Sequence, residues 1–264
     1  MKPVSPPAPA AADFLSRSAI IIPALNEAPC VAGTVAYWRS RAASLVRVVD
    51  NGSTDDTATH ARTADSEVLC EPRRGYGAAA WTGTRGLPPV IDWIVFSSAD
   101  GSDRLDDPEA KQFQRAIDAG ADIVLGERVS LPSSRERLTP TQRFGNALCC
   151  ALIALGWGRR FHDMASLRSI RRDAFERLHL ADRAFGWNVE MQVRAVEHGL
   201  RIAEVPVHFH ARVAGESKIS GNLRGIVRAG RGILAMVGKL HAGRAPRRTW
   251  PANANAHSAH TVSR

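Results

Sequence analysis

A carboxylate beside a flexible glycine follows one of the short apolar runs in the first half of the chain. The run at 93–96 is followed at 98–101 by Ser-Ala-Asp-Gly. A carboxylate in such a place can bind a hard divalent cation that also contacts substrate phosphates. Mg²⁺ or Mn²⁺ held by Asp100 would neutralise charge on a departing diphosphate, so we expect Asp100 to be a metal ligand. The alternative role, a cap for the following helix, suits Asp103 or Asp106 better.

Polar residues also follow the first two apolar runs. The first run ends at Pro23, which stops a strand, and Asn26 and Glu27 then lie in a loop where an open sheet can hold a nucleotide. The second run ends at Asp50, and an acidic strand tip suits the hydrogen-bond donors of a base or ribose. Taken alone, the segment 50–57 is also consistent with a simple turn and helix cap.

A glycine turn at the start of a helix follows two arginines at 73–77, in the sequence Arg-Arg-Gly-Tyr-Gly. Backbone amides at a helix start and guanidinium groups favour a diphosphate. Glycines also permit close helix packing, which is the competing interpretation. The segment is not the dinucleotide-binding fingerprint, because that pattern needs three glycines after the first strand.

These segments require a regular framework that brings them together. Short apolar runs alternate with segments of helical length, which predicts an α/β fold with a mainly parallel sheet flanked by helices. The polar loops would meet at the carboxyl edge of that sheet. The expected strands are 19–22, 45–49, 67–69, 93–96 and 122–125, and the expected helices between them are 31–41, 54–62, 76–85 and 108–119.

In order and spacing, the four segments resemble family 2 glycosyltransferases of the GT-A fold. Later segments resemble the branch that contains polyprenyl-phosphate (dolichyl-phosphate) mannose and glucose synthases: Arg143-Phe144-Gly145-Asn146, Asp163, Arg168, 185–191 and 212–218. The resemblance covers roughly residues 19–237 and implies a nucleotide-sugar-binding half at 19–130 and a fused acceptor-binding half at 131–220. The remaining expected parts are a disordered arm at 1–18, a basic amphipathic helix at 221–241 and a disordered tail at 242–264.

The resemblance implies inverting, metal-dependent transfer of a hexose from a UDP- or GDP-sugar, with polyprenyl phosphate as the expected acceptor. Asp100, Asp163, Glu190 and Arg212 would be catalytic. The expected nucleotide-sugar-binding residues are Pro23, Leu25, Asn26, Glu27, Asp50, Gly52, Ser53, Arg74, Gly75, Tyr76, Gly77, Ser98, Ala99, Asp100, Ser217 and Lys218.

One residue departs from the family pattern at the metal site. The family usually has Asp-x-Asp, whereas this chain has Ser98 two residues before Asp100. Serine is a poorer ligand than a carboxylate, so either Asp103 assists or the metal binds more weakly.

The acceptor determines whether a general base is needed. A phosphate acceptor is already anionic at neutral pH, whereas an alcohol acceptor would need Asp163 or Glu190 as a base. In the competing interpretation, Asp163 and Glu190 are buried carboxylates that pair with Arg168 or Arg194.

The charge distribution suggests which surfaces the chain contacts. The formal net charge is +9, and basic residues concentrate in the last third without the interleaved aromatics of a single-strand binder, which disfavours nucleic acid. The residue pattern of 142–158 predicts a helix that is either buried or located at a membrane interface. The pattern of 221–240 predicts a helix whose basic face is either exposed to solvent or in contact with anionic lipid. The four cysteines lack metal spacing, and no apolar run spans a bilayer. A cytoplasmic protein, peripheral at the inner membrane face, is therefore expected.

Three other functions compete with transfer to a lipid phosphate. A glycosyltransferase with a soluble acceptor fits the same motifs. A sugar nucleotidyltransferase would carry a glycine-rich basic loop after the first strand, which 23–27 does not provide. A non-catalytic nucleotide-binding relative is suggested by Ser98.

Overall fold

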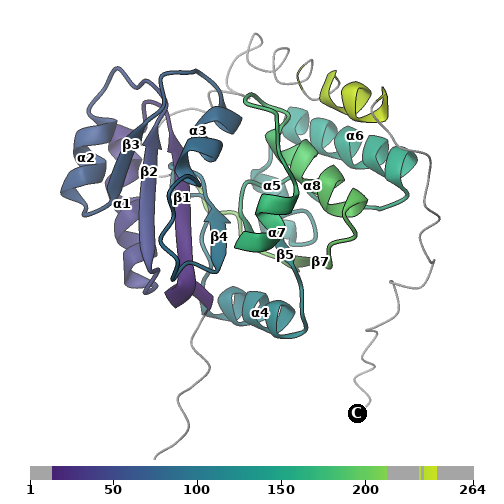
Figure 1. Ribbon diagram of the computed structural model, residues 1–264, viewed down its shortest axis with the longest axis horizontal. Helices are drawn as coiled ribbons and strands as arrows, with labels where there is room; N and C mark the ends of the chain where they lie inside the picture. The colour runs from purple at the N-terminus through teal and green to yellow at the C-terminus, as the bar shows by residue number, and fades with distance from the viewer. Residues whose placement is uncertain (1–13, 213–231, 233–234, 243–264) are drawn as a thin grey trace, which may run out of the picture.

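A seven-stranded sheet with helices on both faces forms the body of the protein in this computed structural model, which describes residues 14–212, 232 and 235–242 (Figure 1). The strand order is β3-β2-β1-β4-β6-β5-β7; β6 runs antiparallel to β4 and β5, and the other neighbours are parallel. The strands are β1 Ser18–Ala24, β2 Leu45–Asp50, β3 Glu67–Cys70, β4 Trp93–Phe96, β5 Ile123–Glu127, β6 Arg168–Arg171 and β7 Ile202–Pro206.

The helices lie mostly between the strands, as the alternation of apolar runs predicted. The expected α/β fold with a mainly parallel sheet is confirmed. Each strand and helix expected in the first half is present; the strand 93–96 has the expected bounds, and the ends of the others are shifted by three residues at most. The helices are α1 Ala28–Ser40, α2 Thr57–Thr63, α3 Tyr76–Gly83, α4 Asp107–Asp118, α5 Pro132–Arg137, α6 Pro140–Trp157, α7 Arg172–Arg177 and α8 Trp187–Glu197, after a 3-10 turn at Phe14–Arg17.

Two hydrophobic cores cover the two faces of the sheet. Successive side chains of a strand point to opposite faces, so Ile21 of β1 packs in one core with α3, α6, α7 and α8. Ile20 and Ile22 pack in the other core with α1 and α4. All three isoleucines are fully buried, which explains why this strand is apolar along its length.

The start of the chain and one strand in its second half differ from the sequence expectation. Residues 14–18, assigned to a disordered arm, form the 3-10 turn and the first residue of β1, because Phe14 packs its ring 6.4 Å from that of Trp93 and 6.2 Å from that of Phe113. The antiparallel strand β6 was not expected.

Several expectations fall on parts of the chain that the structure does not describe. Ser217, Lys218, most of the basic segment 221–241 and the tail lie outside the described residues. Where that segment is described, Met236, Val237 and Leu240 are buried in the core that contains α6 and α8. One sheet joins the two expected halves, and their boundary at residue 130 stays a prediction. Among the described residues, no helix combines the length and apolar character needed to cross a membrane.

Candidate active site

The loops after β1 and β2 are bound to each other at the carboxyl edge of the sheet. The amide of Asn26 donates to Ser53 Oγ at 2.9 Å, and Asn26 Oδ1 accepts from the amide of Thr54 at 2.8 Å. Asn26 has a φ of 51°, a left-handed conformation that asparagine tolerates better than most residues. The amide of Ser53 donates to Asp50 Oδ1 at 3.1 Å. The structure thus brings the segments 23–27 and 50–53 together.

The arginine-glycine segment lies against the same turn. Asn51 organises it, because its side-chain amide donates to the Arg73 carbonyl at 2.8 Å and its Oδ1 accepts from the Gly75 amide at the same distance. A Cβ on Gly52 would lie 3.3 Å from Arg74 Nε, so the Arg74 guanidinium lies over the β2 turn. Arg74 is therefore placed where it can meet a phosphate bound beside these loops.

The two glycines at the start of α3 have the packing role that the sequence left open. The amides of Gly77 and Ala78 donate to the carbonyls of Ala184 and Arg183 at 3.0 and 2.9 Å. These donors are therefore engaged by the 183–184 backbone. Tyr76, between the glycines, is buried, and burial raises the pKa of its hydroxyl to about 12.

We expect Gly75→Ala to destabilise the protein by about 1–3 kcal/mol, the usual cost of forcing extra atoms into a packed site. A Cβ on Gly75 would lie 2.2 Å from the Arg183 carbonyl oxygen, and its φ of 148° disfavours other residues. Urea unfolding measures the change. Gly33→Ala is the matched control, since nothing lies within 4 Å of the added carbon in the interior of α1. Equal stability of the two variants would contradict the packing role.

Asp100 lies at the centre of a buried polar cluster after β4. Its side chain is almost fully enclosed, and Oδ1 accepts from Ser98 Oγ at 2.8 Å, Ser102 Oγ at 2.6 Å and the Ser102 amide at 3.0 Å. Oδ2 contacts Arg212 Nη2 at 2.7 Å, and another nitrogen of Arg212 lies 4.0 Å from Glu27. Arg212 therefore links the loop after β4 to the loop after β1.

Asp103 is held by the protein itself. Its Oδ2 accepts from the Ser98 amide at 2.8 Å and from Ser166 Oγ at 2.6 Å. Burial, together with the nearby Asp100 carboxylate, raises the pKa of Asp103. This carboxylate thus fixes the loop that carries Ser98 and Asp100.

The oxygen atoms around Asp100 fit a hard divalent cation. One carboxylate with two serine hydroxyls beside it matches the preference of Mg²⁺ and Mn²⁺ for oxygen. The described residues contain no group of three or more His, Cys, Asp or Glu side chains arranged to hold a metal ion. Substrate phosphates and water would have to complete such a coordination shell, which is the usual arrangement for Mg²⁺.

Residues after β7 bring Arg212 to this cluster. The His208 amide and ring Nδ1 contact Glu109 Oε1 at 2.6 and 2.8 Å, and the His210 amide donates to the Ser102 carbonyl at 3.1 Å. Phe209 forms a bridge with Asp103. The segment is therefore fixed beside the loop that leads into α4, and Arg212 follows directly.

Asp163 is the buried partner of an arginine that the sequence did not identify. Its Oδ2 accepts from the amide and Nε of Arg128 at 2.9 and 2.7 Å, and its Oδ1 accepts from Arg128 Nη2 at 2.9 Å and from the Met164 amide at 2.7 Å. Although burial opposes it, the Asp163 charge raises the pKa of Arg128. The pairing of Asp163 with Arg168 or Arg194 that the sequence suggested is replaced by this one.

Glu190 holds a loop. Its carboxylate accepts from the amide of Ala181 at 3.0 Å and from that of Asp182 at 2.7 Å, and its side chain is buried. Arg168 is fully buried and donates to the carbonyls of Ala165 and Asn188, and burial lowers its pKa to about 10. Neither Asp163 nor Glu190 is among the hydrogen-bond partners of Asp100.

The sequence missed two residues that support this site. Ser102 makes two hydrogen bonds to Asp100, and its position two residues later is the signal, since aspartate often bonds the backbone there. Arg128 directly follows β5, just as the other polar candidates lie at or after the ends of β1, β2 and β4.

Comparisons with known proteins identify the family. The model for glycosyl transferase family 2 matches residues 19–179. An uncharacterized glycosyltransferase of Mycobacterium tuberculosis is 34% identical over 208 residues, which cover 79% of this chain and 92% of the relative. Polyprenol monophosphomannose synthase of Mycolicibacterium smegmatis is 31% identical over 237 residues, covering 81% of this chain and 85% of the relative.

A solved structure shares the fold. Glucosyl-3-phosphoglycerate synthase of Mycobacterium tuberculosis, crystallised with Mn²⁺, UDP-glucose and phosphoglyceric acid, superposes with a TM-score of 0.67 at 17% identity. The match covers 92% of this chain and 87% of that one. The sequence resemblance is thus confirmed: the chain is a glycosyltransferase of the GT-A fold and belongs to glycosyl transferase family 2.

Proposed function

We propose that this glycosyltransferase transfers a hexose from a UDP- or GDP-sugar to polyprenyl phosphate, with inversion and with the help of Mg²⁺ or Mn²⁺. The observation that carries the proposal is the position of Asp100, Ser98 and Ser102 beside the loops after β1 and β2, with Arg212 between Asp100 and Glu27. The named relative that makes a polyprenol phosphate sugar supports the acceptor.

The residues have separate roles in this proposal. The loops 23–27 and 50–53 hold the nucleoside, and Arg74 and Arg212 meet the diphosphate. Asp100, with Ser98 and Ser102, holds the metal, which supplies a Lewis acid for the charge of the departing diphosphate.

Asp163 and Glu190 then position their neighbours. The hydrogen bonds of Asp163 fix the Arg128 side chain, and those of Glu190 fix the backbone at 181–182. A polyprenyl phosphate is already anionic and requires no strong base, so the engagement of both carboxylates is compatible with this acceptor.

The donor can be tested by calorimetry. We expect Mn²⁺ with UDP or GDP to bind tightly, and Asp100→Asn to weaken binding of the metal–nucleotide pair more than binding of the nucleotide alone. Equal weakening of both would contradict a metal role for Asp100.

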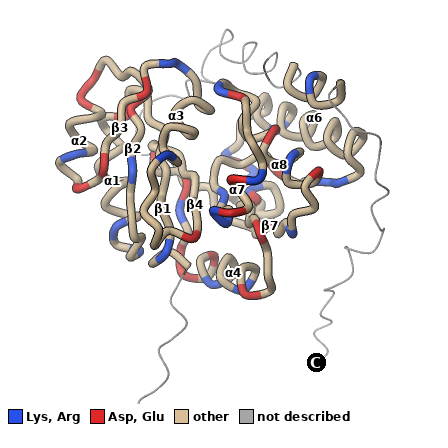
Figure 2. The backbone as a smooth tube through the Cα atoms, in the orientation of Figure 1, with Lys and Arg blue, Asp and Glu red and all other residues tan. Residues whose placement is uncertain are grey.

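Helix α6 supports a membrane-associated acceptor. Its outward face exposes Phe144 and Leu155 to 71% and 78%, with Leu148 between them. The helix carries a single charged residue, Arg143, so it is almost entirely tan in Figure 2, and Arg159 and Arg160 follow its end. An apolar stripe flanked by basic residues suits an anionic lipid surface, so we propose that α6 rests on the inner face of the membrane.

A double variant tests this contact. We expect Phe144→Glu with Leu155→Glu to lower binding to vesicles containing about 30% anionic lipid by at least tenfold, because two charges would enter the apolar boundary. Cosedimentation measures the bound fraction, which should also fall at high salt. Val90→Glu is the control, since Val90 is 56% exposed elsewhere on the molecule. Unchanged binding of the double variant would favour a soluble acceptor.

Arg212 should compete with the metal for Asp100 before the donor binds. The guanidinium occupies Oδ2, so we expect Arg212→Ala to raise the affinity for Mn²⁺ alone by roughly fivefold while slowing sugar transfer. Electron paramagnetic resonance titration of free Mn²⁺ reports the affinity, with Arg160→Ala as the control. A weaker or unchanged affinity would show that Arg212 does not cover the metal site.

A further inference from the structure

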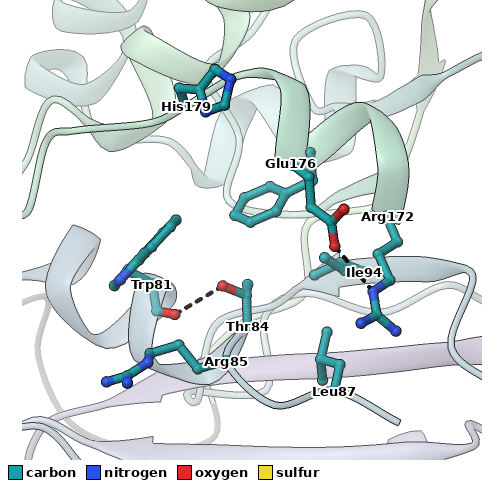
Figure 3. A pocket seen from close by; sticks show the side chains of 9 residues that line it. Trp81, Thr84, Arg85, Leu87, Ile94, Arg172, Glu176 and His179 are labelled. Carbon is teal, nitrogen blue, oxygen red and sulfur yellow. Dashed lines mark hydrogen bonds and ion pairs between the residues drawn. The ribbon is translucent and has the colours of Figure 1, made fainter. Parts of the chain in front are cut away.

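A cavity of about 270 Å³ lies at the end of the sheet opposite Asp100, between α3, α7 and the start of β4 (Figure 3). Ile94 in its wall is the second residue of β4, whereas Asp100 follows the last. Thr84, also in the wall, follows the last residue of α3, whereas Gly75 precedes the first. None of the lining residues belongs to the candidate active site.

The floor of the cavity is apolar and aromatic. Leu87, Ile94 and Phe175 are at most 6% exposed, and the ring of Trp81 lies 6.3 Å from that of Phe175. The Arg183 guanidinium lies 4.4 Å from the centre of the Trp81 ring, which fixes the orientation of the indole. Such a surface suits a ring or a short branched hydrocarbon.

The rim of the cavity is cationic. Arg172 is neutralised by Glu176 at 3.3 Å and also donates to a backbone carbonyl. Arg85 and His179 are exposed, and within the described part of the chain no side-chain nitrogen of either lies within 4.0 Å of a carboxylate oxygen. Besides a hydrogen bond from a threonine hydroxyl, the charge of nearby Arg85 helps to lower the pKa of the Glu71 carboxyl. They lie at opposite ends of the cavity in the view of Figure 3. His179 has a φ of 46°, a left-handed conformation that costs energy and often occurs at ligand sites.

We propose that this cavity is a second ligand site, separate from the donor site, for a small amphipathic anion: a ring or short branched hydrocarbon that carries one carboxylate, sulfonate or phosphate group. The apolar body would cover Trp81, Phe175 and Leu87, and the anionic group would bind the Arg85 guanidinium. The volume is just below the usual range of small-molecule pockets, which restricts the ligand to about the size of a bicyclic ring.

Aromatic contacts connect this cavity to the active-site side of the sheet. Phe175 lies 6.1 Å from both Phe96 and Trp187, measured between ring centres. Phe96 ends β4 two residues before Ser98. A ligand against Phe175 would therefore contact the same aromatic cluster that contains Phe96, without occupying the donor site.

Calorimetry with naphthalene-1-sulfonate, using neutral 1-naphthalenemethanol as the matched compound, tests the proposal. We expect the sulfonate to bind one to one, and Arg85→Glu to weaken it by at least about tenfold while changing binding of the neutral compound much less. Thr84→Trp, which fills the cavity, should abolish binding of both. Arg62→Glu, on the exposed side of α2, is the charge-matched control and should leave binding unchanged.

The remaining outcomes separate the alternatives. Saturating UDP with Mn²⁺ should not displace the sulfonate, and displacement would place the ligand in the donor site and overturn the proposal. If the sulfonate bound equally well to the wild type and to Thr84→Trp, it would bind on another surface, and the proposal would be overturned. Absence of saturable binding to folded wild-type protein below about 10 mM would also overturn it. None of these results depends on the identity of the sugar acceptor.

Discussion

Asp100→Asn is expected to reduce sugar transfer at least about a hundredfold, because loss of one preorganised electrostatic contact to a developing charge typically costs this much. Asparagine keeps the shape of the side chain and can still accept from Ser98 and Ser102, so the loop should remain folded. Steady-state transfer at saturating Mn²⁺ measures the rate, and Mn²⁺ titration should show weaker binding in the same variant.

Two companion variants make this result specific. Asp65→Asn removes an exposed carboxylate that pairs with Arg39, and its transfer rate should equal that of the wild type. Ser98→Asp restores the two-carboxylate pattern of the family and should strengthen Mn²⁺ binding. If Asp100→Asn transferred sugar at the wild-type rate, Asp100 would not be the metal ligand.

Arg128→Met is expected to lower the free energy of unfolding by about 3–5 kcal/mol, the usual cost of removing one partner of a buried ion pair. Asp163 is only 1% exposed, and two of the four hydrogen bonds to its carboxylate come from the Arg128 side chain, so its buried charge would lose its ion-pair partner. The hydrogen bond from the backbone amide of residue 128 remains in the variant, so we expect the loss of unfolding free energy to lie near the lower end of this range. Urea unfolding at pH 7 measures the change.

An exposed pair provides the control for this prediction. Arg39→Met breaks the surface pair with Asp65 and should change stability by less than about 1 kcal/mol. Adding Asp163→Leu to Arg128→Met should recover much of the loss, since the unpaired charge is then absent. If Arg128→Met were as stable as the wild type, the Arg128–Asp163 pair would not stabilise the fold. That result would favour a catalytic role for Asp163.

The sequence predicted the framework of the site because parallel strands place their carboxyl ends at one edge. Pro23, Asp50 and Asp100 each follow an apolar run, and the run alone determines the end of the sheet at which they lie. The motifs then indicated the family, and the match to the model of glycosyl transferase family 2 confirms it. This part required only local patterns.

Contacts between distant residues could not be predicted in the same way. The pairing of Asp163 with Arg128 spans 35 positions and depends on how β5 meets the segment before β6. A glycine pair such as Gly75 and Gly77 is found both in phosphate-binding turns and in closely packed helices. Only the close approach of the Arg183 backbone shows that these glycines serve packing. Strand β6 is four residues long and includes two arginines, so its composition did not indicate a buried strand.

The most direct test of the proposed function is a transfer assay with purified protein, Mn²⁺, a mixture of UDP- and GDP-sugars, and detergent-dispersed polyprenyl phosphate, with all products identified by mass spectrometry. We expect one sugar-phosphate lipid that disappears in Asp100→Asn, together with release of the matching nucleoside diphosphate. Free nucleoside diphosphate without a glycolipid, or donors that remain intact, would contradict transfer to polyprenyl phosphate.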